Sequence, residues 1–175
     1  MDPKLWSVVI YSPNKFLSKL QFDLFRDAHA KSIQVAANGK DTLAFAKDYS
    51  ANVVVVDLSE GVEECLELVK SIRRPADSPA KKAFIFGVST RMTLSLVEKC
   101  RIAGVNAAVG LPLSRTSLIQ TVQKVLSKPR PFIEVESYTG PCRRAGIVSV
   151  NAVENRRRAT ERVESQLPDT TLNTA

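Results

Sequence analysis

The strongest chemical signal in the sequence is the carboxylate of Asp57, which directly follows four consecutive valines at 53–56. A run of this kind is typical of a strand that is buried on both faces in the centre of a parallel sheet. The hydroxyl groups of Ser89 and Thr90 follow a second apolar run at 83–88. Ligands of open parallel sheets bind beyond the carboxyl ends of the strands, so these side chains are the first candidates for a site.

The elements that must position these side chains alternate along residues 1–128. Apolar runs that predict strands lie at 5–11, 32–37, 52–57, 83–88 and 105–109. Segments with apolar residues at helical spacing lie at 15–26, 41–49, 62–72, 94–102 and 114–126. Five strands that alternate with five helices predict an α/β fold with a doubly wound parallel sheet.

Composition limits the class of protein. The chain has 175 residues, of which 44% are hydrophobic and 25% charged, which is typical of a globular domain with an additional segment. No apolar run is long enough to span a bilayer, and no signal peptide is apparent, so we expect a cytoplasmic protein without membrane contact. Three widely spaced cysteines and one histidine match no zinc pattern, and no nucleophile–base pair or phosphate loop is apparent. We therefore expect no metal centre, no cofactor, no catalytic residues and no enzyme activity.

The formal net charge of +7 is spread over the chain. Residues 1–127 and 128–175 are both mildly basic, which favours a solvated basic surface over a nucleic-acid site. Nucleic acid remains an alternative partner.

Residues 5–128 resemble the receiver domain of bacterial two-component response regulators, in particular the chemotaxis-regulator type. The segments that carry the resemblance are VVVVDL, FGVST and AGVNAAVGLP, which end near Asp57, Ser89 and Pro112. The resemblance implies a flavodoxin-like sheet with strand order 2-1-3-4-5. It also implies that Asp57 is the phosphoacceptor of a histidine kinase and that Ser89, or Thr90, contacts the phosphoryl group.

Other positions depart from the family pattern. Tyr11 and Ser12 stand where the family has an acidic pair that helps to hold Mg²⁺. Ala108 replaces the aromatic switch residue, and Leu111 replaces a lysine that contacts the phosphoryl oxygens. Without these charges a phosphoryl group on Asp57 would be poorly compensated, so we expect weak or no Mg²⁺ binding and little phosphorylation. The alternative for Asp57 is a carboxylate that caps nearby N–H groups, and for the two hydroxyls a role in a turn.

The segment after residue 128 differs in character. Residues 129–147 include FIEVESYTGPCRR, which resembles an RxYxGPxRR-type extension of some proteobacterial receivers, and we expect it to pack on the domain with a Thr-Gly-Pro turn. Residues 148–167 predict a basic helix, and residues 168–175 a disordered tail. The candidate residues for binding a ligand or partner are Arg143, Arg144, Arg156, Arg157 and Arg158.

Three functions remain open at this point. The first is a pseudo-receiver that acts by contact with a protein partner, such as a histidine kinase or another regulator, or as a homodimer, through residues 94–124. The second is an effector whose arginine-bearing tail binds a nucleotide second messenger or nucleic acid. The third is a receiver regulated by phosphorylation of Asp57.

Overall fold

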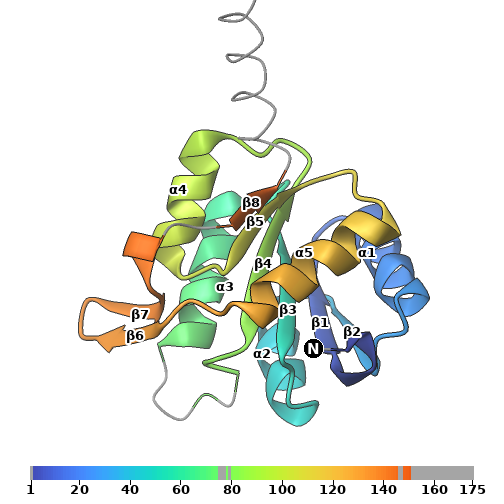
Figure 1. Cartoon of the computed structure of the whole chain (residues 1–175), viewed down its shortest axis with the longest axis horizontal. Helices are drawn as coiled ribbons and strands as arrows, with labels where there is room; N and C mark the ends of the chain where they lie inside the picture. Colours follow the sequence, from blue (N-terminus) through green and yellow to red (C-terminus); the bar gives the residue numbers. More distant parts are fainter. Residues whose placement is uncertain (1, 75–77, 79, 146–147, 151–175) are drawn as a thin grey trace, which may run out of the picture.

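The computed structural model describes residues 2–74, 78, 80–145 and 148–150, and its main body is a sheet with helices on both faces (Figure 1). The strands of the sheet are β1 (Ser7–Tyr11), β2 (Ser32–Ala36), β3 (Val53–Asp57), β4 (Phe84–Ser89), β5 (Ala107–Gly110) and β8 (Val148–Val150). The helices are α1 (Lys15–Asp27), α2 (Gly39–Asp48), α3 (Val62–Arg73), α4 (Leu94–Ala103) and α5 (Arg115–Ser127). Among these described helices, none combines the length and the apolar character needed to cross a membrane.

All neighbouring strands of this sheet are parallel, in the order β2-β1-β3-β4-β5-β8. The predicted flavodoxin-like arrangement of five strands in the order 2-1-3-4-5 is confirmed. The sixth strand, β8, was not predicted, and it pairs with the edge of β5 that the five-stranded fold would leave open. Ser89 is the last residue of β4, so the strand extends one residue beyond the apolar run 83–88.

Two hydrophobic clusters, one on each face, hold the helices against the sheet. Val54 and Val56 pack with α2, α3 and α4, whereas Val53 and Val55 pack with α1 and α5. This division follows from the alternation of side chains along a strand, which sends every second valine of β3 to the opposite face. The four-valine run is therefore the centre of both cores, as a strand buried on both faces requires.

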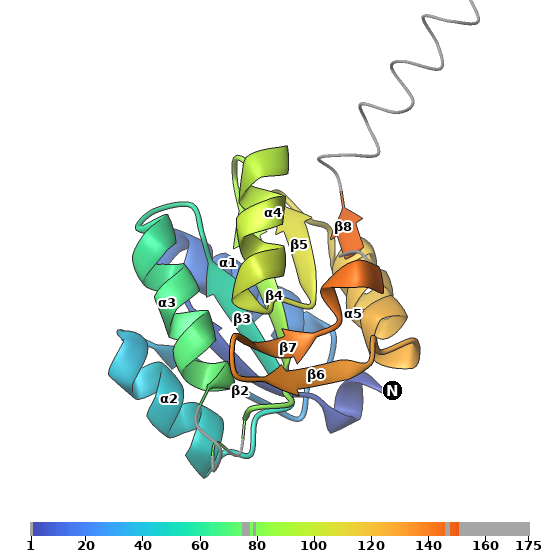
Figure 2. The same cartoon turned by 90° about the vertical axis from the view of Figure 1, so that its left-hand side faces the viewer.

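Residues 129–145 continue from α5 into a hairpin made of β6 (Phe132–Val135) and β7 (Tyr138–Pro141). Figure 2 shows this hairpin beside the ends of α3 and α4. Gly104, which ends α4 with a φ of 98°, lies so close that an added Cβ would be 3.1 Å from the carbonyl oxygen of Thr139. The extension is thus packed directly onto the receiver-like body.

Two predictions for the C-terminal segment are wrong. Thr139–Pro141 lies inside β7 and the hairpin turns at 136–137, because the apolar and aromatic residues on both sides pair as strands. Residues 148–150 form a parallel strand instead of the start of a helix, because the open edge of β5 supplies backbone partners that no local pattern reveals. The remainder of the predicted helix, 151–167, and the tail 168–175 lie outside the described residues.

Candidate functional site

Asp57 is the last residue of β3 and is fully buried at the carboxyl edge of the sheet. Its Oδ2 accepts a hydrogen bond from the Ser12 hydroxyl at 2.6 Å, and its Oδ1 accepts one from the backbone N–H of Ser59 at 2.9 Å. The first distance is in the range of strong, charge-assisted O–H···O⁻ bonds. Among the described residues, no ion pair involves Asp57. Its negative charge is therefore held by neutral donors.

Tyr11 and Ser12 lie at the end of β1, next to β3, as the parallel sheet requires. The Ser12 hydroxyl also lies 3.0 Å from the carbonyl oxygen of Asn14, so the β1–α1 turn positions it toward the carboxylate. The Tyr11 side chain packs against the α3 and α4 side of the core. Burial, together with the neighbouring Cys65 and Glu64, raises the pKa of its phenol, which therefore stays neutral. Neither position supplies a carboxylate, and Ser12 places a hydroxyl group directly on Asp57.

Within the described part of the chain, no hydrogen bond joins the hydroxyl groups of Ser89 and Thr90 to the Asp57 carboxylate. Ser89 is buried, and its Oγ accepts a hydrogen bond from the backbone N–H of Arg91 at 3.1 Å. Thr90 is exposed, and its backbone N–H donates to the Ser59 hydroxyl at 3.2 Å. Ser89 thus stabilises the loop between β4 and α4 in the manner of a turn-forming hydroxyl, whereas Thr90 joins that loop to Ser59 through its backbone.

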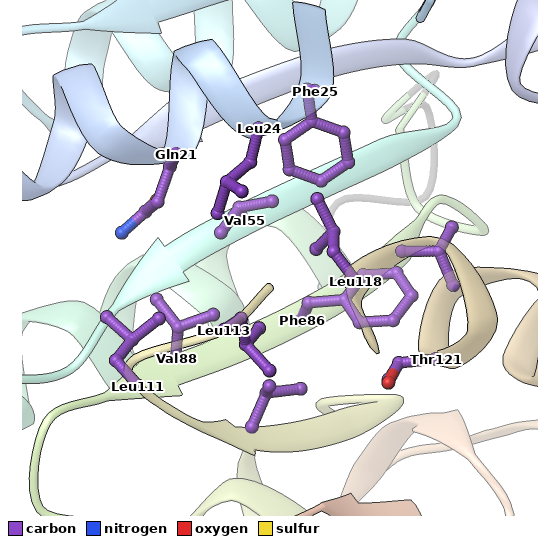
Figure 3. A pocket seen from close by; sticks show the side chains of 12 residues that line it. Gln21, Leu24, Phe25, Val55, Phe86, Val88, Leu111, Leu113, Leu118 and Thr121 are labelled. Carbon is purple, nitrogen blue, oxygen red and sulfur yellow. The ribbon is translucent and has the colours of Figure 1, made fainter. Parts of the chain in front are cut away.

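Leu111 lies in an apolar environment at the same edge. It lines a narrow cavity of about 20 Å³ between α1, α5 and the sheet, together with Val88 and Leu113 (Figure 3). Ala108 is fully buried on the opposite face of the sheet, in the cluster with α3 and α4. Neither side chain can supply the positive charge or the mobile aromatic ring that the receiver pattern has at these positions.

Two polar side chains, those of Gln21 and Thr121, interrupt the apolar lining of this cavity. Gln21 projects from α1 beside it, is 3% exposed, and neither of its amide atoms has a hydrogen-bond partner. Nothing in the sequence marked Gln21, because it occupies an ordinary position in an amphipathic helix.

The residues around Asp57 do not fit the Mg²⁺ ion that the receiver fold commonly uses. Mg²⁺ requires octahedral oxygen ligands, usually from more than one carboxylate or phosphate group together with waters. Here the described residues contain no cluster of three or more acidic, histidine or cysteine side chains that could hold a metal ion. The hydroxyl nearest to Asp57 donates its hydrogen to the carboxylate and so competes with a cation for the same oxygen.

A thiol group lies directly behind the candidate site. The Cys65 Sγ, in the first turns of α3, donates to the backbone carbonyl of Asp57 at 3.2 Å. Burial, and then the charges of Asp57 and Glu64, raise the pKa of Cys65 to about 11. Cys65 is therefore a protonated, structural thiol at neutral pH rather than a nucleophile.

A second polar centre, which the sequence did not indicate, lies at the opposite edge of the sheet. Arg73 at the end of α3 is 1% exposed, and all five of its N–H donors are used. They reach the carbonyl oxygens of Lys81, Ala83 and Gly104 and the side-chain oxygen of Asn106. Burial lowers the pKa of Arg73 to about 9, so it is still charged at neutral pH. This arginine joins α3 to the starts of β4 and β5.

The arginines of the extension lie beside this centre. The Arg130 guanidinium donates to the carbonyl oxygens of Val105, Asn106 and Cys142, which attaches the extension to the α4–β5 loop. The predicted candidate Arg143 stacks on Tyr138, with its Cζ 4.2 Å from the ring centre.

Of the other predicted arginines, the structure describes only Arg144. Arg144 is exposed, and Arg156, Arg157 and Arg158 lie outside the described residues.

Comparisons with known proteins give a match in structure but not in sequence. No protein-family model matches the chain, and no curated protein matches it significantly. Chemotaxis protein CheY4 of Vibrio cholerae superimposes with a TM-score of 0.62 at 21% identity, over 69% of this chain and 98% of CheY4. A response regulator from Thermotoga maritima gives 0.61 at 19% identity, over 71% and 99% of the two chains.

A third structure, the CheX–CheY–BeF3–Mg complex of Borrelia burgdorferi, contains a chain that matches with a TM-score of 0.58 at 22% identity. The match covers 73% of this chain and all of the other. Each of these neighbours is covered almost completely, whereas more than a quarter of this chain has no counterpart in them. These matches confirm, for the fold, the resemblance inferred from the sequence. The larger part of this chain forms a CheY-like receiver fold, and the rest of the chain has no counterpart in the neighbours.

Proposed function

We propose that the chain is an atypical receiver-type signalling protein of a two-component-type pathway. It acts in the cytoplasm by contact with another protein, such as a histidine kinase or a second regulator, or with a second copy of itself. Phosphoryl transfer that depends on Mg²⁺ is weak or absent in this proposal. The observation that supports it most directly is the hydrogen bond of 2.6 Å by which the Ser12 hydroxyl holds the Asp57 carboxylate.

The physical argument concerns charge. Phosphoryl transfer is catalysed mainly by positioning and by neutralising the phosphoryl oxygens with metal ions and cations. A phosphoryl group adds about two negative charges. Here Asp57 is fully buried beside the Ser12 hydroxyl, and the apolar Leu111 stands where the receiver pattern has a lysine. The cost of placing that charge in a buried, uncompensated position opposes the reaction.

The partner surface of this proposal is α4, because β8 already occupies the edge of β5. The helix exposes Leu94 and Ile102, which are 52% and 48% accessible. A partner that packs on this helix would not need to separate β8 from the sheet.

The decisive experiment uses the full chain labelled with ¹⁵N. Beryllofluoride, a phosphoryl analogue, is added with millimolar Mg²⁺, and the amide signals of Ser59, Ser89 and Arg91 are followed. We expect them to stay in place, while a conventional receiver domain under the same conditions shows large shifts. Saturable shifts at these residues would contradict the proposal and favour a phosphorylation-regulated receiver.

A cellular experiment separates the same alternatives. Asp57→Asn should leave signalling unchanged if the carboxylate has only a structural role. A disabling effect in a variant that accumulates to normal levels would assign phosphorylation to Asp57.

A further inference from the structure

A pocket of about 180 Å³ lies between the ends of α3 and α4 and the β6–β7 hairpin. In a parallel sheet each helix runs antiparallel to the strands, so the carboxyl ends of α3 and α4 lie near the amino ends of the strands. The pocket therefore lies at the amino ends of the strands. Figure 2 shows the three elements meeting there. The pocket is therefore on the opposite edge of the sheet from Asp57 and shares no residue with that site.

The lining of the pocket is cationic. Lys70 and Arg74 contribute positive charge from the end of α3, and Arg143 contributes it from the extension, whereas none of the described residues that line the pocket is acidic. Among the described residues of α3 and α4, Glu67 pairs with Lys70, and Glu98 pairs with Arg101, which does not line the pocket. Both carboxylates are more than half exposed, so solvent screens them.

Basic residues at the end of a helix often serve only to compensate the helix dipole. That explanation is adequate for Lys70 and Arg74. It does not apply to Arg143, which comes from a different segment of the chain and converges on the same pocket. The buried Arg73 lies beneath these residues, with all of its donors bound to the protein, so it adds positive potential without offering a hydrogen bond.

Arg143 is held in place by its surroundings. Its guanidinium stacks on the ring of Tyr138, whose hydroxyl donates to the carbonyl of Pro141 at 2.6 Å. The Arg101 guanidinium donates to the Arg143 carbonyl at 3.2 Å and fixes the backbone. No described residue accepts a hydrogen bond from the Arg143 guanidinium. Its planar set of donors is thus positioned in advance and available to a ligand.

We propose that this pocket binds the phosphate group of a small phosphorylated molecule. Arg143 and Arg74 donate to the phosphate oxygens, Lys70 supplies a third charge, and the nearby Ser137 and Thr139 offer hydroxyl groups. The volume is below the range of about 300–1,000 Å³ that is typical of sites for larger ligands. The pocket therefore accommodates a phosphate or diphosphate group, and the rest of a larger ligand would lie outside it. This site shares no residue with the surroundings of Asp57, whereas Ile102 belongs both to the pocket and to the surface of α4 proposed for a partner.

The test is a titration of the full-length, ¹⁵N-labelled chain with pyrophosphate, inorganic phosphate and ADP. We expect saturable binding of pyrophosphate, with shifts at residues 102, 137 and 139. If ADP binds more tightly than pyrophosphate, the natural ligand is a nucleotide, whereas equal affinities assign recognition to the phosphate groups alone.

Three variants with the same change of charge make the test specific. Arg143→Gln and Arg74→Gln should each weaken pyrophosphate binding about tenfold or more. Arg91→Gln, which removes an exposed arginine from the Asp57 edge, should change it less than twofold. Amide spectra of the variants verify that each is folded.

Several outcomes would overturn the proposal. One is the absence of saturable binding, and another is equal weakening by all three variants, which would indicate a general effect of net charge. Binding of single-stranded DNA that depends on Arg143, without any binding of pyrophosphate, would assign the surface to nucleic acid instead.

Discussion

The hydrogen bond between Ser12 and Asp57 can be measured by a double-mutant cycle. Ser12→Ala removes a donor that lies 2.6 Å from a fully buried carboxylate, whose other oxygen accepts the backbone N–H of Ser59. Hydrogen bonds to charged groups contribute about 1.5–3 kcal/mol, and a buried charge that loses its donor adds a desolvation penalty. We therefore expect Ser12→Ala to lower the free energy of unfolding at neutral pH by about 2–3 kcal/mol.

The cycle isolates the charged interaction from the other contacts of Ser12. The serine also lies close to the backbone of Asn14, and that contribution is lost equally whether Asp57 is intact or replaced by asparagine. In the Asp57→Asn background the acceptor carries no charge, so Ser12→Ala should cost less by about 1.5 kcal/mol or more, which is the coupling energy. Urea unfolding followed by the fluorescence of Trp6, the single and fully buried tryptophan, provides the assay.

A matched control uses another buried serine. Ser18 lies in α1, and its hydroxyl donates to the backbone carbonyl of Lys15 at 3.0 Å rather than to a carboxylate. Ser18→Ala combined with Asp57→Asn should give a coupling energy below about 0.5 kcal/mol, as expected for independent sites. If the Ser12 cycle gives the same small value, the reasoning that the serine holds the charge of Asp57 is refuted.

Further predictions concern other buried groups. Arg73→Met should lower the free energy of unfolding by about 3 kcal/mol or more, because several buried carbonyl oxygens lose their donors, and Arg73→Lys should recover only part of this in urea unfolding. Gln21→Leu should raise the free energy of unfolding by about 1–2 kcal/mol, because an apolar group replaces a buried amide without partners. A lower free energy of unfolding in this variant would contradict the prediction. Burial raises the pKa of Cys65 to about 11 and that of Cys100 to about 12, so the thiolate forms are scarce at pH 8. Mass spectrometry after brief alkylation of the native protein should find label on Cys142 only, and labelling of the other two before unfolding would be inconsistent with the structure.

The parts of the fold that sequence reasoning predicted are those encoded by local patterns. The valine run of β3 and the helical spacing in α1 and α5 are visible within a window of a dozen residues. Asp57 was identified because its position follows from such a run. The replacement of charged residues at Tyr11 and Ser12 was also visible, although the hydrogen bond that joins Ser12 to the carboxylate was not.

The features that were missed depend on residues far apart in the chain. Arg73 looks like one of many basic residues at a helix end, and only the fold brings the carbonyl of Gly104 to it. The cationic pocket likewise combines α3 with Arg143, about 70 residues later. The strand β8 has three residues and gains its structure from the edge of β5 rather than from its own sequence. Long-range contacts of this kind have no periodic signal.

The position of β8 has a consequence for competition between intramolecular and intermolecular strands. A short segment attached to the same chain faces the edge of β5 at an effective concentration on the order of 1 mM. A strand of equal intrinsic affinity from another protein, present at about 1 µM, would displace it in roughly one molecule in a thousand. A strand of another protein can therefore replace β8 on β5 under one of two conditions. Either the partner also binds elsewhere on the molecule, or its strand pairs about a thousandfold more tightly than Val148–Val150.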